Sequence, residues 1–416
     1  AEAGAARPRA PRRSFTRLGV IGAGMMGAGI ARAAAGRGIA VTLLDRDAES
    51  AAAGHARIAA ALETAVAAGR TTPGAAAATL ARITPAAGPE ALAGAELVIE
   101  AVFEQTALKQ AVTRAALPHL GAETILASNT STISIDTLGA ALPAPGRFLG
   151  LHFFSPVERM PLVEIIRGSA TSDATLAAAL DLVLQLGKTP IVVSTSPGFF
   201  TSRIFCTWID EAMAMLAEGV APALIENAAR RIGAPVGPLA VTDEVSLALQ
   251  QEVIDQAEAD GLAPRFLRGH ARPVIARMLG LGRPGRKARA GFYDYPAGAA
   301  KRLWPGLAEV FPAAAPQPGV EEIGTRLLAI QALDAARCLE EGVVARAEDA
   351  DLGAVLGVGF PSWTGGPLSY IDMTGAEAFV ATCDQLAARH GARFRPSAAL
   401  RVHAAAGRRF HEGERA

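Results

Sequence analysis

Short apolar runs alternate with longer stretches of helical character over the first half of this 416-residue chain. An apolar run at 18–21 leads through a glycine-rich turn into a helix of small residues, and a second run ends on Asp45. Later runs that we interpret as strands lie at 95–102, 124–128, 148–154, 162–166 and 189–194. Helical patterns between them lie at 48–82, 105–120 and 172–187. This alternation predicts an α/β fold with a doubly wound sheet, whose ligands bind at the carboxyl ends of the strands.

The glycine turn has the spacing of a dinucleotide-binding motif, Gly22-Ala-Gly24-Met25-Met26-Gly27. Gly22 permits the tight turn, Gly24 lets the backbone approach a diphosphate, and Gly27 lets the helix pack on the sheet. The free N–H groups at the helix start are suited to phosphate. Asp45 follows 18 residues after Gly27, where a carboxylate accepts hydrogen bonds from the adenosine ribose and repels a 2′-phosphate. The motif therefore predicts a Rossmann domain that binds NAD rather than NADP.

The pattern changes after Ser196-Pro197-Gly198 to successive helices, with no convincing strand before 291–296. The helical pattern then repeats, because RIFCTWIDEAMAMLAEGV at 203–220 resembles RLLAIQALDAARCLEEGV at 326–343. GPLAVTD at 237–243 likewise resembles GPLSYID at 366–372, and these shared landmarks argue against a chance likeness of alanine-rich helices. The predicted organisation is a leader at 1–14, the Rossmann domain at 15–196, a first helical domain at 197–296, a linker at 297–320 and a second helical domain at 321–416.

Charge and cysteine content exclude several classes of protein. Forty basic side chains balance 40 acidic ones, so no net field would gather nucleic acid or an anionic membrane. No apolar run approaches a membrane span, which needs about 18 residues. Three widely spaced cysteines without a Cys-x-x-Cys pair argue against a disulfide framework or a metal site and suit a reducing compartment. We expect a cytoplasmic protein that binds small molecules.

His152 and Glu164 flank the segment FFSPVERMPLV, and the two apolar runs that carry them can fold back as an antiparallel pair. With the turn centred on Glu158, the two side chains lie opposite each other. A carboxylate facing an imidazole fixes its tautomer and supports it as a general base in alcohol oxidation. We interpret the pair as a His–Glu dyad, with a hydrogen-bonded core histidine as the alternative.

Asn129 and Ser131 follow the predicted strand at 124–128 and therefore emerge at the carboxyl edge of the sheet. There, Ser131 can hydrogen-bond the reacting oxygen. The alternative is ordinary turn or helix-cap chemistry.

Charged side chains on the predicted helices are further candidates. Glu104 and Lys109 begin the helix at 105–120 and are expected to touch the riboses of the cofactor; taken alone, each is an ordinary solvated charge. Three basic residues are expected on a solvated helix face, with a substrate phosphate as the alternative partner: Arg57, Arg70 and Arg82.

With these residues in place, the chain resembles the L-3-hydroxyacyl-CoA dehydrogenase family, and within it the dehydrogenase part of the bacterial multifunctional fatty-acid oxidation alpha subunit. The resemblance extends from about residue 17 to residue 296, and the repeated helical unit extends it to about residue 411. The matching stretches are GVIGAGMMGAGIA, LVIEAVFEQTALK, ASNTSTISI, GLHFFSPVERMPLVEII, SPGFFTSR, GAPVGPL and GFYDY.

The resemblance implies NAD-dependent oxidation of an (S)-3-hydroxyacyl-CoA to a 3-ketoacyl-CoA in fatty-acid β-oxidation. It implies that His152 takes the proton, Glu164 orients this base and Ser131 holds the substrate oxygen. The residues expected at the cofactor are Gly22, Gly24, Met25, Met26, Gly27, Asp45, Glu104, Lys109, Asn129, Ser131 and Ser155.

Two positions depart from the family pattern. The family commonly has Asn three residues after the catalytic His, and Asn before the Arg of the PGF segment, where this chain has Ser155 and Ser202. Serine is shorter but still donates and accepts hydrogen bonds. We therefore expect retained chemistry with altered positioning or chain-length preference, and we expect Ser202 to contact the substrate.

Alternatives to this activity are a dehydrogenase of another β-hydroxy acid and an NAD-binding relative without turnover. The spacing in HFFSPVERMPLVE favours the acyl-CoA enzyme, and the joint presence of Ser131, His152 and Glu164 argues against a protein without turnover. The resemblance leaves open an enoyl-CoA hydratase domain or a thiolase subunit as a partner. Because two helical units can cover each other's apolar surface, we expect the isolated polypeptide to be a monomer.

Overall fold

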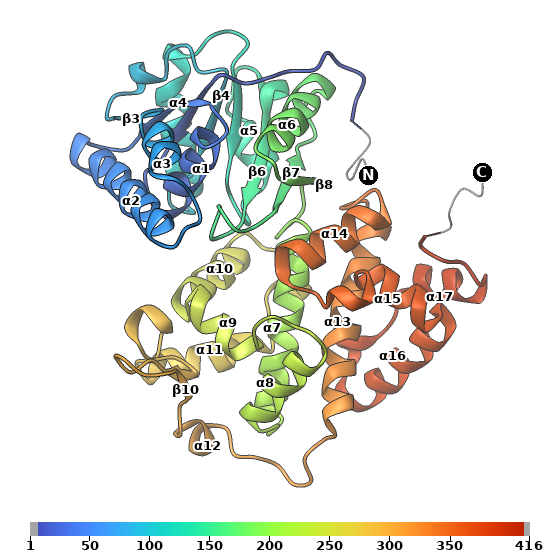
Figure 1. Cartoon of the computed structure of the whole chain (residues 1–416). Coiled ribbons are helices and arrows are strands. Elements are labelled where there is room, and N and C mark those ends of the chain that lie inside the picture. Colours follow the sequence, from blue (N-terminus) through green and yellow to red (C-terminus); the bar gives the residue numbers. More distant parts are fainter. Residues whose placement is uncertain (1–6, 412–416) are drawn as a thin grey trace. The chain divides into compact units, whose positions relative to one another are not determined.

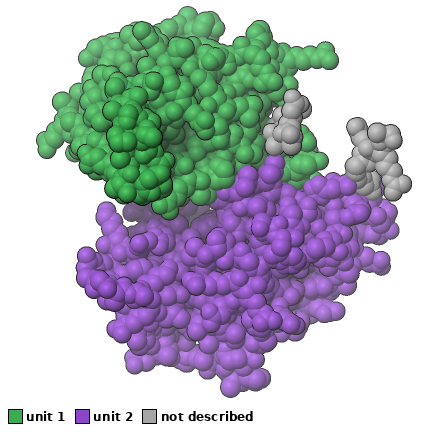
Figure 2. Space-filling model, in the orientation of Figure 1, with its two compact units in different colours: residues 1–199, 343–349 green, residues 200–342, 350–416 purple. Residues whose placement is uncertain are grey.

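The computed structural model of the chain describes residues 7–411. The chain forms two compact units, coloured separately in Figure 2. The first comprises the residues up to Phe199 together with the later segment Val343–Asp349, and the second comprises Phe200–Gly342 and the residues from Ala350 onward. The first unit is therefore completed by a segment from far along the chain.

An eight-stranded sheet forms the centre of the first unit, in the order β3-β2-β1-β4-β5-β6-β7-β8 (Figure 1). All neighbouring strands are parallel except β6 and β7, which are antiparallel. The strands are β1 (Arg17–Ile21), β2 (Ala40–Leu44), β3 (Ile83–Ala86), β4 (Leu97–Glu100), β5 (Ile125–Ser128), β6 (Phe148–Phe153), β7 (Leu162–Arg167) and β8 (Thr189–Ser194). The continuous burial of β4, β5 and β6 is typical of strands covered by helices on both faces.

The connecting helices of this unit are α1 (Met25–Ala35), α2 (Ala48–Ala67), α3 (Pro73–Leu80), α4 (Thr106–Ala116), α5 (Ile135–Gly139) and α6 (Asp173–Gln185). Apolar side chains of β1, β2, α1 and α6 form one core with those of β6 and β7. The predicted doubly wound α/β sheet is confirmed.

The single helical region expected at 48–82 is wrong, because it consists of two helices. Gly69, with φ of 67°, ends α2 in the left-handed conformation, and the Thr72 hydroxyl then caps α3 by accepting from the Ala75 N–H. The next strand, β3, was missed in the sequence. It lies at the edge of the sheet, only Ile83 is fully buried in it, and it contains Pro85, so its apolar signal is weak.

The second half of the chain is helical, as expected. Its helices are α7 (Thr201–Ala217), α8 (Pro222–Arg231), α9 (Pro238–Val245), α10 (Leu247–Ala259), α11 (Ala271–Gly280), α12 (Leu307–Val310), α13 (Val320–Glu340), α14 (Ala347–Val358), α15 (Pro367–Thr374), α16 (Ala376–His390) and α17 (Ala398–Ala405). A two-stranded sheet pairs β9 (Tyr293–Asp294) with β10 (Arg302–Leu303). The stretch at 297–320 therefore contains β10 and α12, and Leu307 is buried in the helical core.

Helices α7 and α13 pack against each other and carry equivalent ends of the sequence repeat. Arg203 on α7 forms ion pairs with Asp334 at 2.9 Å and with Glu341 at 2.8 Å.

In return, Arg326 on α13 forms ion pairs with Glu211 at 2.6 Å and with Glu218 at 2.8 Å. The equivalent positions of the repeat are Arg203 and Arg326, Glu211 and Asp334, and Glu218 and Glu341. Each half thus offers the same charges to the other, which is the contact pattern of a two-fold interface.

The segment Val343–Asp349 lies along β8, the last strand of the sheet. Val344 forms an antiparallel bridge with Val193, and the Ser194 N–H donates to the Val343 carbonyl at 2.8 Å. Asp349 accepts a hydrogen bond from the Val192 backbone.

Part of the expected leader at 1–14 lies outside the described residues. Within its described part, Arg7 forms an ion pair with Asp181 of α6 at 2.7 Å, and the Arg13 N–H donates to the same carboxylate at 2.9 Å. Over residues 7–411, the structure contains no helix with the length and apolar character needed to cross a membrane.

Candidate active site

The glycine turn joins β1 to α1. Gly22 has φ of +103°, and a Cβ there would lie 2.7 Å from the Ala101 carbonyl oxygen, so only glycine fits. Gly24 is the N-cap of α1 and makes no side-chain cap, while a Cβ on Gly24 would meet nothing within 4 Å. A Cβ on Gly27 would overlap the Gly22 carbonyl oxygen. An open helix start with a close-packed turn fits the diphosphate of a dinucleotide.

Asp45 follows β2 and is tied to this turn. One carboxylate oxygen accepts from the Ala23 N–H at 2.7 Å, and the other accepts from the Arg46 N–H at 2.7 Å. Its side chain is only partly buried, so it retains acceptor capacity beside the turn.

Met25 is 69% exposed at the start of α1, and Met26 beside it is partly buried against the core of the sheet. The Ser155 hydroxyl lies 3.9 Å from the Met25 sulfur. The structure therefore brings the loop after β6 to the glycine turn.

A buried lysine holds that loop. The Lys188 ammonium donates to the Val157 and Met160 carbonyls, both at 2.6 Å. Burial lowers the pKa of Lys188, although the Glu158 carboxylate opposes this shift. The loop between His152 and Glu164 is thus anchored by the residue that precedes β8.

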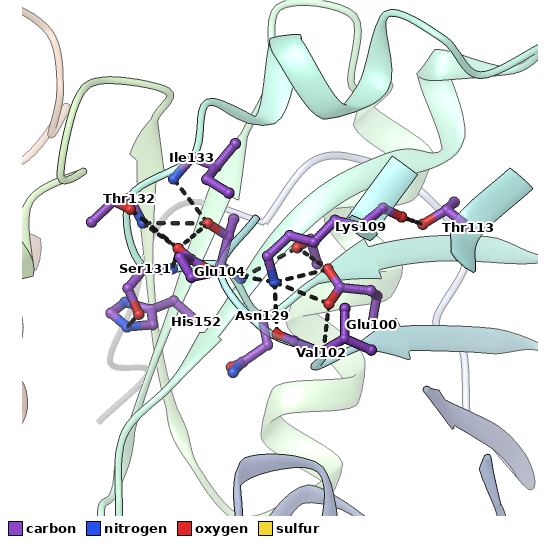
Figure 3. Close-up of polar contacts among 12 residues, drawn as sticks. Glu100, Val102, Glu104, Lys109, Thr113, Asn129, Ser131, Thr132, Ile133 and His152 are labelled. Carbon is purple, nitrogen blue, oxygen red and sulfur yellow. Dashed lines mark hydrogen bonds and ion pairs between the residues drawn. The ribbon is translucent and has the colours of Figure 1, made fainter. Parts of the chain in front are cut away.

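Glu100 and Lys109 form a buried ion pair behind the carboxyl end of β4 (Figure 3). The Lys109 ammonium lies 3.0 Å from Glu100, 3.2 Å from Glu104 and 3.2 Å from the Val102 carbonyl oxygen. The Ser128 hydroxyl donates to Glu100 at 2.6 Å. Lys109 is 2% exposed, so its ammonium is enclosed by protein groups. It therefore holds the Glu104 carboxylate in place through their ion pair.

Glu104 orders the turn after β5 (Figure 3). One of its oxygens accepts from the Thr130 hydroxyl at 2.6 Å, the Ser131 N–H at 2.8 Å and the Thr132 N–H at 3.0 Å. Burial by itself would raise the pKa of Glu104, but attraction to Lys109 and these hydrogen bonds lower it. Glu104 precedes α4, which begins at Thr106, and so does not begin the helix as expected.

Ser131, His152 and Glu164 form a continuous hydrogen-bonded chain. Glu164 faces His152 in the antiparallel register of β6 and β7, which confirms the predicted pairing. His152 Nδ1 lies 2.9 Å from a Glu164 oxygen, and His152 Nε2 lies 3.1 Å from the Ser131 hydroxyl. Glu164 is fully buried and His152 is 6% exposed. The Phe154 ring packs 4.5 Å from the imidazole, so the pair is held in apolar surroundings.

Asn129 and Ser202 are not members of this hydrogen-bonded chain. The Asn129 side chain accepts from the Phe153 N–H at 2.8 Å and so ties the end of β5 to β6. Ser202 is the second residue of α7 and is half-buried within the second unit.

Sequence reasoning missed the side chains of Glu100, Ser128 and Thr132 in this network. The available signal was Glu100, since a carboxylate that ends a fully buried strand needs a partner. Throughout the described residues 7–411, no cluster of His, Cys, Asp and Glu side chains is arranged to hold a metal ion.

The parallel sheet and the glycine turn define a dinucleotide-binding protein of the Rossmann class. Residues 17–196 match the NAD binding domain of 3-hydroxyacyl-CoA dehydrogenase, and residues 198–295 match its C-terminal domain. The chain belongs to the 3-hydroxyacyl-CoA dehydrogenase family. The resemblance seen in the sequence and the assignment of NAD are thereby confirmed.

Two fatty acid oxidation complex alpha subunits are similar to the chain. That of Shewanella halifaxensis is 38% identical over 320 residues, which cover 76% of this chain and 44% of that protein. That of Shewanella amazonensis is 38% identical over 322 residues, which cover 76% of this chain and 45% of that protein. The chain spans less than half the length of these curated relatives.

Solved structures are similar as well. The 3-hydroxybutyryl-CoA dehydrogenase of Escherichia coli is 28% identical with a TM-score of 0.82, and the match covers 95% of this chain and 99% of that one. The (S)-3-hydroxybutyryl-CoA dehydrogenase of Ralstonia eutropha is 37% identical with a TM-score of 0.64, covering 68% of this chain and 100% of that one.

Proposed function

We propose that this protein oxidises the 3-hydroxyl of (S)-3-hydroxyacyl-CoA thioesters to the ketone with NAD, as a step of fatty-acid β-oxidation. The observation that carries the proposal is the chain from Ser131 through His152 to Glu164. It stands at the carboxyl ends of β5 and β6, the edge of a parallel sheet where the glycine turn after β1 also lies.

The chemistry follows from this chain. The hydroxyl proton of the substrate passes to His152 Nε2, while Ser131 hydrogen-bonds the same oxygen. Glu164 fixes the imidazole through Nδ1 and compensates the positive charge that His152 gains. NAD would supply the hydride acceptor for this oxidation, and the glycine turn with Gly22 and Gly24, together with Asp45, would hold it.

The remaining site residues have positioning parts in this proposal. Glu104, held by Lys109, sets the backbone at Ser131. Met25 and Ser155, whose side chains lie 3.9 Å apart, would contact the cofactor, and Ser202 would contact the acyl-CoA substrate.

The proposal extends to the assembly of the chain. Its domains are a Rossmann domain at 15–196, two helical domains at 197–296 and 321–416, and a connection between them. The reciprocal ion pairs of α7 and α13 support a protein that is a monomer when isolated. We place this protein in the cytoplasm. Because similar proteins are alpha subunits of a fatty acid oxidation complex, a hydratase domain or a thiolase subunit are its expected partners.

The test is consumption of NADH with acetoacetyl-CoA, compared with free acetoacetate and other free 3-keto acids. We expect turnover with the thioester and little with the free acids. Turnover confined to free acids would assign the protein to another β-hydroxy acid, and binding of NADH without any turnover would contradict catalysis.

A further inference from the structure

Helix α2 is pressed against the glycine turn. A Cβ on Gly54 would lie 2.5 Å from the Ala23 Cβ and 2.7 Å from the Ala23 carbonyl oxygen, so this helix lies as close as glycine allows. A residue three positions later on a helix shares the same face. That residue is Arg57, whose Nη2 donates to the Ala23 carbonyl at 3.0 Å.

The backbone of Ala23 is thereby held by two side chains. Its N–H donates to Asp45 at 2.7 Å, and its carbonyl accepts from Arg57. Gly24, the next residue, opens α1 without a side-chain cap. The positively charged guanidinium of Arg57 therefore lies at the turn that precedes the uncapped start of α1.

The charge of Arg57 has no carboxylate partner within ion-pair distance among residues 7–411. Its side chain is exposed, and only one of its five N–H donors has a protein acceptor in this part of the chain. A position on a solvated helix face explains why Arg57 is exposed, but it does not explain why Arg57 donates to Ala23 in the glycine turn. Guanidinium groups bind phosphate oxygens in pairs and strengthen anion sites formed by backbone N–H groups.

We infer that Arg57 binds the diphosphate of NAD and is a specific part of the cofactor site. Arg57 adds a fixed positive charge to the N–H groups of α1. This inference rests on the proposed function only in that NAD is the ligand. It concerns binding of the dinucleotide and not the proton transfer at His152.

The test compares Arg57→Ala and Arg57→Lys with Arg70→Ala, a matched control because Arg70 is also exposed and follows the same helix. NADH binding is measured by fluorescence, and ADP-ribose and adenosine are measured by displacement of NADH. Arg57→Ala should raise the Kd of NADH and of ADP-ribose about tenfold, since a hydrogen-bonded charge is lost. Adenosine, which lacks the diphosphate, should bind as before. Lysine should restore part of the affinity.

Three results would overturn the inference while leaving the proposed function intact: an unchanged Kd for NADH, an equal loss for adenosine, or a change confined to the KM of acetoacetyl-CoA. The Kd values of the variants for NADH and adenosine are compared with those of wild-type protein that binds and oxidises NADH. A wild-type protein that binds neither NADH nor ADP-ribose would overturn both together. The melting temperature of each variant shows whether the turn itself has been disturbed.

Discussion

His152 has both of its ring nitrogens engaged, one by Glu164 and one by Ser131. A neutral imidazole donates from one nitrogen and accepts at the other, so a buried carboxylate at Nδ1 selects the tautomer whose Nε2 accepts a proton. Glutamine at position 152 would fill similar space but could not take the proton. The substitution should therefore remove proton transfer without affecting cofactor binding.

His152→Gln should lower turnover of acetoacetyl-CoA by about 10²–10⁴-fold, the range expected for loss of general acid–base catalysis. The Kd of NADH should not change, because the side-chain contacts of His152 with Ser131, Glu164 and Phe154 lie outside the glycine turn. Stopped-flow turnover and fluorescence titration measure the two quantities. A variant within a few-fold of the wild type would refute the role of the dyad.

Asp45→Ala should weaken NADH more than NADPH. The carboxylate beside the Ala23 N–H would accept from the ribose hydroxyls and would repel a 2′-phosphate, so its loss removes an attraction from one cofactor and a repulsion from the other. The ratio of the two Kd values measures the effect. Wild-type protein that oxidised NADPH as readily as NADH at subsaturating cofactor would contradict this reading.

Among the elements, those with strong apolar periodicity were predictable. The strands β1, β4, β5, β6 and β7 and the pairing of His152 with Glu164 follow from local patterns. The strand β3 could not be predicted in this way, because its sequence is weakly apolar. The contact of Val344 with Val193 could not be predicted either, because it joins residues far apart in the sequence. The same reason explains the enclosed position of Lys109, since its partners come from separate strands and loops.

The segment that pairs with β8 ends at Asp349, a carboxyl group whose pKa is changed by folding. Burial raises the pKa of Asp349 to about 6, with Arg346 opposing and Glu348 assisting the shift. One Asp349 oxygen is buried without a hydrogen-bond partner in the described structure, and the carboxylate accepts from the Val192 backbone. The folded state therefore holds this proton more tightly than the unfolded chain does.

Wild-type stability should fall as the pH rises from about 4, the ordinary aspartate value, to about 6, and Asp349 should add no further change above that. Below this window both states are protonated, and above it both are charged. Asp349→Asn cannot release the proton, so its stability should lack this decline. Urea unfolding of both chains across this range measures the difference. Parallel curves for the two proteins would show that Asp349 does not titrate as described.

For the whole molecule, the reciprocal charges of α7 and α13 determine what a shortened chain should do. Removing the residues from Gly319 onward deletes Arg326, the partner of Glu211 and Glu218. Because Arg203 is equivalent to Arg326, a second copy can supply its own Arg203 to these carboxylates.

We therefore expect the full chain to be a monomer and the shortened chain to dimerise through α7 or to aggregate. Light scattering of both proteins measures this. In the shortened chain, Arg203→Glu should abolish the dimer, because it places like charges opposite each other. A full-length dimer formed through the helical units would contradict the argument.

The pairing of β8 with Val343 and Val344 also affects how the protein is made. A sheet edge with unpaired N–H and C=O groups is a template for other strands, and the later segment pairs with this one through Val343 and Val344. Val344 is synthesised about 150 residues after Ser194. At about 5–20 residues per second, the edge of a nascent chain waits roughly 8–30 s for its own partner. During that time neighbouring chains on one messenger can compete for the edge, so slower initiation, which spaces ribosomes apart, should raise the yield of correctly folded protein.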